Sequence, residues 1–553
     1  RIAVRAATRS RQRQLVNRVF GALQVTRQPG VGFVRRLVPG SWVPGRLISC
    51  QAPVFEWPCV LNAAELTGLI AWPFNGPVID GVTYTAGRPL PASHRSLVPP
   101  EVVRALDSTR VGDQLRVIGE ATYPGRDGLL VLRPADAMQH LHVLAPTGSG
   151  KSHLLANLAL QDIAAGRAIV VIEPKGDLVA DILDRVPAQR QSDIVVLDAS
   201  DLTAPVGLNP LATARGSQRE LVVDQLLGTM HNLWRDSWGP RTNDVLHAGL
   251  LTLAGQPGAS LIGLPQLFVD DVYRRSVVGE AVKRDPWGLA SFWAWFDSLS
   301  VENRTQVLAP VMNKLRSFIL RPALRAILGQ PEPRFDLSQV FTQRKTLLVN
   351  LAKGSLGAET AGLLGSLLVA QLWQHTQARS RIDPERRHPV MVFIDEFQDY
   401  LNLPSDMADV LAQARGLGVG MTLSHQHLGQ LSTEVRDAVL ANARSRVVFR
   451  LPHRDARVVA EGHRELTPED IAGLDRYAVY VSLLTDGTVQ PFASGRTRAL
   501  PESSGAAGAI RAASRQRWGV PATETDAHLA ALFGPVQTVE FGEDEFGSRR
   551  RMP

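Results

Sequence analysis

The chain has 553 residues, which is enough for two to four domains of about 100–200 residues each. It is 44% apolar and 20% charged, with 46 Gly and 36 Pro, a globular composition that excludes wholesale disorder, collagen and coiled coil. Its two cysteines, Cys50 and Cys59, exclude a disulfide scaffold and a cysteine-rich zinc module.

The net charge of +7 is concentrated at the start of the chain. Residues 1–50 hold ten Arg and no Asp, Glu or Lys, so the rest of the chain is slightly acidic. Two interpretations of this basic segment are open. It is either a disordered arm, or the stretch just inside a membrane that follows a span upstream of Arg1, because positive residues gather on the cytoplasmic side. No run within the chain has the about 20 apolar residues that a span needs.

Short apolar runs broken by Pro and Gly occupy residues 51–135, and they predict a small N-terminal domain with several strands. The pattern changes from residue 136 onward. An apolar strand, a glycine-rich loop, a helix and a second strand follow one another in "LHVLAPTGSGKSHLLANLALQDIAAGRAIVVIEPKGD". This order is typical of βαβ units and predicts an α/β fold with a parallel sheet.

Residues 216–335 have helical periodicity and almost no strand pattern, for example in "TQVLAPVMNKLRSFILRPALRAILG". Strands and helices alternate again over residues 336–500. We therefore expect one α/β domain, made of residues 136–215 and 336–500, with an all-α domain inserted between its two parts. The tail, residues 501–553, begins with "PESSGAAGA" and ends with "EFGEDEFGSRRRMP", and its composition predicts partial disorder.

Residues 145–152, "APTGSGKS", match the phosphate-binding motif G-x-x-x-x-G-K-[ST], except that Ala145 replaces the first glycine. An apolar strand precedes the motif and a helix follows it, as its mechanism requires. Backbone N–H groups and the helix N-terminus would bind phosphates, Lys151 would reach the β- and γ-phosphates of ATP, and Ser152 would hold Mg²⁺. The predicted nucleotide-binding residues are Ala145, Pro146, Thr147, Gly148, Ser149, Gly150, Lys151, Ser152 and His153.

A buried-strand pattern over residues 390–394 ends in Asp395 and Glu396. Carboxylates at the carboxyl end of such a strand lie beside the phosphate loop in parallel sheets. We expect Asp395 to hold Mg²⁺ through water and Glu396 to polarise the attacking water. The letters "DEFQD" also resemble the second motif of superfamily 1 helicases, but the Gly-Asp segment that should follow is missing after Asp395.

A later strand ends in Gln426, whose amide can hydrogen-bond the γ-phosphate or the attacking water. His425 and His427 flank this residue, and strand alternation could place both imidazoles on one face. No third ligand accompanies them, so the pattern favours a solvated strand end over a metal site.

Two further segments each allow two interpretations. The segment "EPKGD", residues 173–177, could organise the edge of the site or a subunit interface, or it is a strand-to-helix turn with Asp177 as the N-cap. The aromatic segment "WGLASFWAWF", residues 287–296, could stack on single-stranded bases, although a packed helix core is the commoner use of such residues.

Together these motifs resemble the ATPases that include the HerA and FtsK motors and, more closely, the type IV secretion coupling proteins of conjugation. The resemblance covers roughly residues 50–500, and the order of the pieces with the helical insertion is its most specific feature. The matching pieces are "HVLAPTGSGKSHLL", "VVIEPKGDLVADIL", "VGLNPL", "VFIDEFQDY", "LAQARGLGVGMTLSHQHLGQL" and "ANARSRVVFRL". The segment "WGPRTNDVLHAGLL" resembles one common in actinobacterial members.

This resemblance implies a RecA-like nucleotide-binding domain with an inserted all-α domain, ATP and Mg²⁺ as cofactors, and a homohexameric ring around a channel. Members of the family use ATP to bring DNA, with its bound relaxase, to a secretion channel, and many carry N-terminal transmembrane helices. The implied partners are therefore DNA and relaxase or secretion-channel proteins. The implied location is the cytoplasmic face of the cell membrane, with attachment through residues upstream of Arg1.

The resemblance also assigns residue roles. It makes Lys151 and Ser152 the triphosphate and Mg²⁺ residues, Asp395 and Glu396 the second motif, and Gln426 the sensor.

Three arginines are implied as further contacts to the nucleotide. Arg415 matches the position of the family's proposed arginine finger, which enters the neighbouring subunit's site and neutralises transition-state charge. Arg436 falls near another basic γ-phosphate contact of the family, and Arg241, in "WGPR", is another candidate to act across the subunit interface.

Two other functions stay open at this stage. A soluble duplex DNA motor of the HerA and FtsK kind, or an ATPase that secretes protein, would share nearly all of these motifs. The alternative of a different class is a docking receptor that binds nucleotide for assembly and moves nothing. The presence of Lys151, Asp395 and Glu396 argues against that receptor.

Overall fold

The computed structural model describes residues 8–24, 87–99, 102, 115–212, 219–403 and 405–533, without the side chains of residues 22–24 and 317–318. The chain separates into two units, Arg1–Thr83 and Tyr84–Pro553. In the first unit the described element is helix α1, Arg9–Gln24, which lies in the basic segment 1–50. Residues 51–86 lie outside the described residues. In the part of the chain that is described, no helix is long and apolar enough to cross a membrane.

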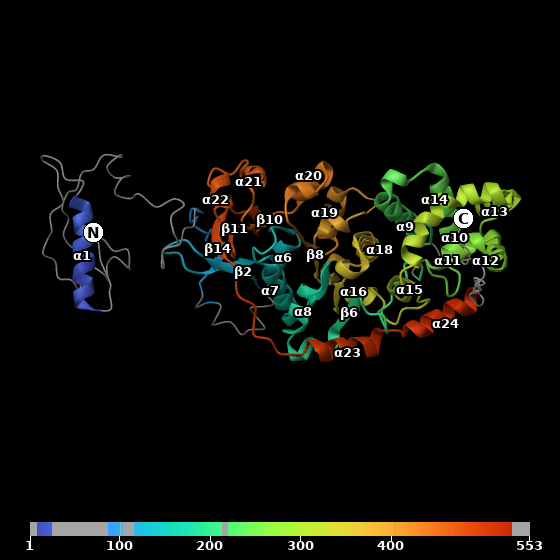
Figure 1. Cartoon of the computed structure of the whole chain (residues 1–553), viewed down its shortest axis with the longest axis horizontal. Coiled ribbons are helices and arrows are strands. Elements are labelled where there is room, and N and C mark those ends of the chain that lie inside the picture. The colour runs from blue at the N-terminus through green and yellow to red at the C-terminus, as the bar shows by residue number, and fades with distance from the viewer. Residues whose placement is uncertain are drawn as a thin grey trace, which may run out of the picture. The chain divides into compact units, whose positions relative to one another are not determined.

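The second unit is built around one twelve-stranded sheet with the order β1-β3-β2-β14-β11-β10-β4-β9-β8-β5-β7-β6 (Figure 1). The strands from β10 to β6 run parallel, and the other five form an antiparallel extension. The α/β fold class predicted from the sequence is therefore confirmed. The strands are β1 (Leu97–Val98), β2 (Arg116–Ala121), β3 (Leu129–Leu132), β4 (Leu141–Leu144), β5 (Ala168–Glu173), β6 (Ile194–Asp198), β7 (Thr346–Asn350), β8 (Val390–Asp395), β9 (Val419–His425), β10 (Ser445–Val448), β11 (Ala478–Ser482) and β14 (Ala493–Arg496), with β12 (Leu484–Thr485) and β13 (Thr488–Val489) in a separate hairpin.

The described strands of the predicted small domain, residues 51–135, belong to this same sheet. Strand β2 pairs antiparallel with β14, through Gly495 opposite Ala121, and so carries β3 and β1 into the sheet. This differs from the sequence prediction, which placed a domain boundary after residue 135. The prediction was wrong on this point because the joining strand, β14, comes more than three hundred residues later in the chain.

Helices cover both faces of the parallel strands. Along β5, Val170 and Ile172 pack in one apolar core with α18, while Ile169 and Val171 pack in a second core with α7 and α8. This two-sided burial explains why the central strands read as continuous apolar runs. The helices around the sheet are α6 (Pro134–Ala137), α7 (Lys151–Ala164), α8 (Asp177–Leu183), α16 (Ser338–Gln343), α17 (Lys353–Leu356), α18 (Ala358–Ala378), α19 (Met407–Gly416), α20 (Thr433–Asn442), α21 (His453–Ala460) and α22 (Pro468–Ala472).

The chain between β6 and β7 forms helices and, within its described residues, no strand. These helices occupy the stretch 216–335, for which the sequence predicts an inserted all-α domain, and share the core on the α18 face of the sheet. In the aromatic segment, Leu289, Trp293 and Phe296 are buried, whereas Trp287 is 88% and Trp295 42% exposed, so only one face of this segment packs in the helix core. The helices are α9 (Arg219–Leu233), α10 (Pro240–Leu253), α11 (Gly263–Val269), α12 (Asp271–Arg284), α13 (Gly288–Ser298), α14 (Val301–Ile319) and α15 (Pro322–Leu328).

Two C-terminal helices, α23 (Ala507–Trp518) and α24 (Ala522–Phe533), run from the edge of the sheet to the helical insertion (Figure 1). We call them the C-terminal strap. At one end the Ser514 hydroxyl accepts a hydrogen bond from the N–H of Val196 in β6, at 2.9 Å. At the other end the rings of Tyr273 and Phe533 meet edge to face.

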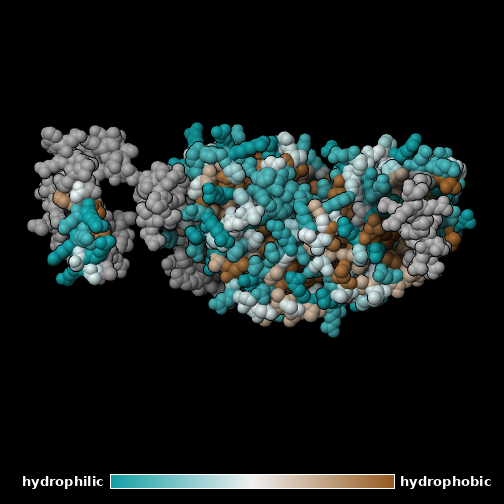
Figure 2. Space-filling view, in the orientation of Figure 1, coloured by the Kyte–Doolittle hydropathy of each residue, from teal (hydrophilic) through white to brown (hydrophobic). Residues whose placement is uncertain are grey.

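The strap shows that residues 507–533 of the tail are ordered, while residues 534–553 lie outside the described part, so partial disorder of residues 501–553 stays a prediction. Ile510, Trp518 and Leu529 are buried, so the strap has apolar anchors that its overall composition conceals. The face in Figure 2 is mostly hydrophilic with scattered apolar residues, as expected for a domain surface.

Candidate nucleotide-binding site

The predicted phosphate loop connects β4 to α7 at the carboxyl end of the parallel sheet. Gly148 and Gly150 have φ angles of 81° and 115°, in the region that favours glycine. Ala145, the departure from the motif, is fully buried and has no positive φ, and its N–H donates to the carbonyl of His425 at 3.1 Å. A side chain is therefore tolerated at this first position of the loop.

Tyr477, which no motif in the sequence singles out, contacts this loop from its position just before β11. Its N–H donates to the carbonyl of Ser149 at 2.9 Å, and its own φ is 68°. A Cβ added to Gly150 would lie 2.5 Å from the Tyr477 ring, and the same ring meets His153 edge to face. The loop thus requires glycine at residue 150 for its conformation and for its contact with this ring.

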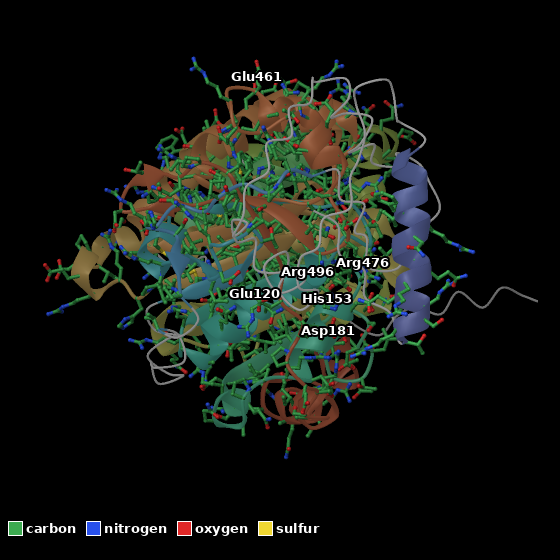
Figure 3. The ribbon with its side chains drawn as sticks, turned by 90° about the vertical axis from the view of Figure 1, so that its left-hand side faces the viewer. Glu120, His153, Asp181, Glu461, Arg476 and Arg496 are labelled. Atoms are coloured by element: carbon green, nitrogen blue, oxygen red, sulfur yellow. The ribbon has the colours of Figure 1, made fainter. Side chains whose placement is uncertain are left out.

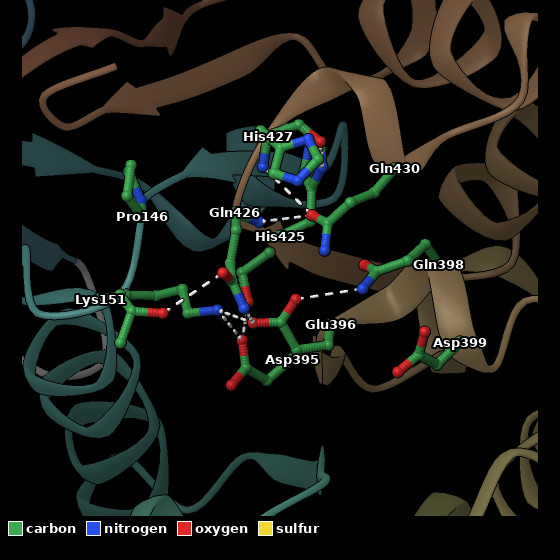
Figure 4. A network of polar contacts seen from close by, with 12 residues as sticks. Pro146, Lys151, Asp395, Glu396, Gln398, Asp399, His425, Gln426, His427 and Gln430 are labelled. Atoms are coloured by element: carbon green, nitrogen blue, oxygen red, sulfur yellow. Dashed lines mark hydrogen bonds and ion pairs between the residues drawn. The ribbon is translucent and has the colours of Figure 1, made fainter. Parts of the chain in front are cut away.

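Lys151 lies between the two carboxylates that follow β8 (Figure 4). Its Nζ is 2.8 Å from Asp395 Oδ1 and 2.6 Å from Glu396 Oε1, and all three side chains are about one-tenth exposed. Burial lowers the pKa of Lys151, but the two carboxylates outweigh it, so the net pKa is raised. The structure therefore brings Lys151 together with Asp395 and Glu396, which follow it by 244 and 245 residues in the sequence.

Glu396 is held in a strained and highly bonded position. It has a left-handed backbone, with a φ of 53°, which is unfavourable for a residue with a side chain. Gln426 Nε2 donates to Glu396 Oε1 at 2.9 Å, and Gln398 Nε2 donates to Oε2 at 3.1 Å. Burial raises the pKa of Glu396, but the charge of Lys151 and these hydrogen bonds outweigh it, so the net pKa is lowered and the residue is a carboxylate at neutral pH.

Asp395 and Ser152 are the residues predicted to hold Mg²⁺. The hydroxyl of Ser424, a neighbour that the sequence did not reveal, donates to Asp395 Oδ1 at 2.7 Å and orients the carboxylate. Ser152 is half-buried in the first turn of α7. A hydroxyl and a carboxylate are the hard oxygen donors that Mg²⁺ prefers, and no larger cluster of metal-binding side chains occurs among the described residues.

The three candidate arginines do not reach this cluster within the chain. Arg415 is exposed in the last turn of α19, just before β9 begins, whereas Gln426 follows the end of β9. A strand of seven residues places these ends about 20 Å apart. Arg436, on α20, forms an ion pair with its neighbour Asp437, and Arg241 is exposed in the first turn of α10.

The segment "EPKGD" forms the turn between β5 and α8, but Asp177 is not its N-cap. The N-cap is Gly176, and the buried carboxylate of Glu173 accepts from the N–H of Val179 in the first turn, at 2.5 Å. Burial raises the pKa of Glu173 to about 7, the backbone hydrogen bonds oppose this rise, and the charge of Asp395 adds to it. Lys175 is exposed.

The raised pKa of Glu173 predicts a pH-dependent stability. When a carboxyl has a higher pKa in the folded than in the unfolded state, the free energy of unfolding falls as its proton is lost. For Glu173 this fall occurs as pH rises from about 4.5 to about 7. Glu173→Gln removes this titration, so it should leave stability nearly unchanged at pH 4 and raise it by up to about 3 kcal/mol at pH 8. Unfolding in urea at the two pH values measures this difference, and Asp177→Asn, an exposed carboxylate beside it, is the control. An equal effect of Glu173→Gln at both pH values would contradict the assignment.

A cavity of about 540 Å³ lies beside the phosphate loop, and residues 146–149 of the loop form one of its walls. The other wall comes from the segments after β10 and before β11, which contribute Arg450, His453 and Arg476. His153 and Arg476, both labelled in Figure 3, each contact the ring of Tyr477. The cavity is large enough for a nucleoside next to bound phosphates.

The fold is similar to solved structures of the conjugative coupling protein TrwB. An unbound form has a TM-score of 0.52 at 16% identity, over 76% of this chain and 97% of that chain. A TrwB complex with the GTP analogue GDPNP has a TM-score of 0.51 at 16% identity, over 76% and 98%. A TrwB complex with ADP and Mg²⁺ has a TM-score of 0.50 at 16% identity, over 76% and 96%. No family model and no curated protein matches this chain.

Proposed function

We propose that this chain is an ATP-driven DNA translocase of the coupling type, which delivers DNA and its relaxase to a type IV secretion channel at the cytoplasmic face of the membrane. The observation that carries the proposal is the cluster of Lys151, Asp395 and Glu396 beside a glycine-bent phosphate loop. The similarity of the fold to TrwB supports the coupling type over an unrelated P-loop enzyme.

Hydrolysis of ATP follows from the chemistry of these side chains. The N–H groups of the loop and the N-terminus of α7 bind the phosphates, and Lys151 exchanges its carboxylate partners for phosphate oxygens. Ser152 and Asp395 would hold Mg²⁺, which neutralises charge on the phosphates. Glu396, a carboxylate at neutral pH, then accepts a proton from the attacking water. Gln426, hydrogen-bonded to Glu396, is placed to orient that water or the γ-phosphate.

The nucleoside would occupy the cavity beside the loop. Arg450 and Arg476 line it and are exposed, and neither forms an ion pair among the described residues. A guanidinium can stack on a nucleobase or bond to a ribose.

The position of Arg415 favours assembly into a ring. The phosphate loop and Gln426 of the same chain lie at the other ends of the parallel strands. A catalytic role for Arg415 therefore requires the site of a second subunit. A ring in which each subunit supplies an arginine to its neighbour meets that requirement.

We expect Arg415→Ala to keep ATP binding and to lower turnover about 10³-fold, the range of other arginine fingers. Mixing it with Lys151→Ala subunits should restore part of the activity, because some interfaces then combine an intact loop with an intact arginine. Arg386→Ala, an exposed arginine in the segment before β8, is the matched control. Mixtures that remain inactive, or a monomer whose specific activity does not depend on its concentration, would contradict a role in trans.

The central experiment measures ATP turnover and oligomer size of the purified chain with and without single- and double-stranded DNA. Turnover stimulated by DNA, together with a larger assembly, supports the translocase. Stimulation confined to duplex DNA would favour a motor of the HerA and FtsK kind. Nucleotide binding without turnover in any arm would favour a docking receptor.

A further inference from the structure

Two fully buried histidines connect the phosphate strand to the sensor strand. His142 lies on β4, three residues before Ala145, and His425 is the last residue of β9. They are 1% and 0% exposed, and their Nε2 atoms are 2.8 Å apart. The two rings are nearly parallel, with an interplanar angle of 13°. Neither residue has a role in the hydrolysis described above.

The surroundings assign the protons of this pair. His425 Nδ1 is 3.1 Å from the carbonyl of His427, which can only accept, so Nδ1 carries the hydrogen. His425 Nε2 is then the acceptor, and His142 Nε2–H is the donor. His142 Nδ1 is left unprotonated, and this buried atom has no hydrogen-bond partner. Burial lowers the pKa of both groups, to about 4 for His425 and well below the ordinary value for His142, so the pair is neutral at physiological pH.

His425 opens a tight turn, residues 425–430, that we call the sensor turn because it contains Gln426. The side-chain carbonyl of Gln430 accepts from the N–H groups of Gln426 and His427, each at 3.1 Å. The N–H of Leu428 donates to the buried carboxylate of Asp455 at 2.9 Å. The turn is therefore shaped by Gln430, one of its own side chains, and by Asp455 from α21.

His425 also contacts the residue that follows the catalytic Glu396. The ring of Phe397, the residue after Glu396, meets the His425 ring edge to face at 5.1 Å between centroids. The same imidazole thus touches the turn that carries Gln426 and the segment that carries Glu396.

We propose that His142 and His425 are a positioning pair, which ties the sensor turn and Glu396 to the strand that carries the phosphate loop. Neither imidazole contacts nucleotide, so the pair acts only through the groups that it orients. A movement of β4 when phosphate binds would reach Gln426 through this hydrogen bond, in addition to the backbone bond from the Ala145 N–H to the His425 carbonyl. This inference rests on the proposed function as an ATPase.

Substitutions can separate the two hydrogen bonds of His425. Asn places its amide nitrogen near imidazole Nδ1, and Gln places it near Nε2. His425→Asn therefore keeps the bond to the His427 carbonyl and loses the bond to His142. His142→Gln keeps a donor for His425, whereas His142→Leu removes it.

We expect His142→Leu and His425→Asn to lower turnover at saturating ATP by about 10-fold to 100-fold, the usual effect of losing a residue that orients an active-site group. The Kd for ATP should change less than about threefold, because the phosphate loop is intact. His142→Gln should recover most of the turnover. The double variant should have a turnover no lower than that of the less active single variant, because both substitutions remove the same hydrogen bond.

His140 provides the matched control. It is also buried, it also connects to β9 by accepting from the N–H of Met421 at 3.0 Å, and it lies just before β4, at the end of the strand away from the phosphate loop. His140→Gln perturbs the same strands without touching the sensor turn, so its turnover should stay close to that of the unchanged protein. Equal losses in His140→Gln and His142→Leu would show general damage to the sheet and overturn the proposal. Normal turnover in His142→Leu would overturn it as well.

A readout that does not depend on activity separates this proposal from the proposed function. In histidine-selective ¹⁵N NMR at pH 7, the His425 imidazole should be the Nδ1–H tautomer, and the signal that disappears in His425→Asn identifies it. His142→Leu should shift the same signal without removing it. If the full chain hydrolyses no ATP while these signals appear, the proposed function fails and the pair stands as a structural link. If the signals show no such tautomer, the pair itself is wrong.

Discussion

Glu396→Gln should stop ATP turnover and leave ATP binding intact. The amide has nearly the same shape as the carboxylate, but it cannot take a proton from water. Loss of a general base lowers the turnover rate by up to about 10⁴-fold. Lys151 keeps an oxygen partner in the variant, and its bond to Asp395 at 2.8 Å is unchanged. Turnover assays at saturating ATP, with a separate binding titration, measure the two properties.

Asp399→Asn is the control for that experiment. Asp399 lies three residues further on but bonds to Lys353 at 2.6 Å, and it makes no contact with Lys151. Its turnover should stay near that of the unchanged protein. Normal hydrolysis by Glu396→Gln would remove Glu396 as the base, and a loss of binding in the same variant would assign it to the binding site instead.

Lys151→Ala should abolish detectable ATP binding and also destabilise the free protein. The loop then has no lysine for the phosphates, and two buried carboxylates face each other without the cation that now lies between them. Breaking a buried ion pair in this way costs on the order of 3 kcal/mol.

The loss of stability should depend on pH in a defined direction. In the unchanged protein the lowered pKa of Glu396 stabilises the fold above its ordinary pKa, and this contribution disappears as pH falls through the lowered value. In Lys151→Ala the carboxylates repel, so the destabilisation should be larger at pH 8 than at pH 5. Lys353→Ala, which removes a more exposed lysine paired with Asp399, is the control. A pH-independent loss would contradict the proposed charge balance.

The parts of the site that were predictable are those with local signals. The glycines and Lys151 lie within eight consecutive residues, and Asp395 and Glu396 directly follow an apolar strand. In a parallel sheet built from βαβ units, the carboxyl ends of the strands lie on the same side of the sheet. The cluster could therefore be expected from the sequence.

The missed residues act through contacts between distant segments. Tyr477 contacts the phosphate loop from its position just before β11. His142, on β4, bonds to His425 at the end of the adjacent strand β9, where the sensor turn begins. Neither follows a motif or a periodicity, and a tyrosine or histidine in an apolar run has the pattern of ordinary core. The same reason explains the wrong boundary after residue 135, because strand pairing at the sheet edge leaves no signal in local composition.

The ends of the sheet have a consequence for synthesis of the chain. Strand β14 lies between β2 and β11, and α23 packs beside β6, so both ends of the sheet are completed by residues that are made after the other strands of the sheet. A nascent chain that stops before residue 493 holds β1, β2 and β3 without a partner strand to join them to β11. Unpaired strand edges are templates for aggregation, and slow long-range pairing prolongs their exposure. Ribosome-bound and prematurely terminated forms of this protein are therefore natural clients for chaperones.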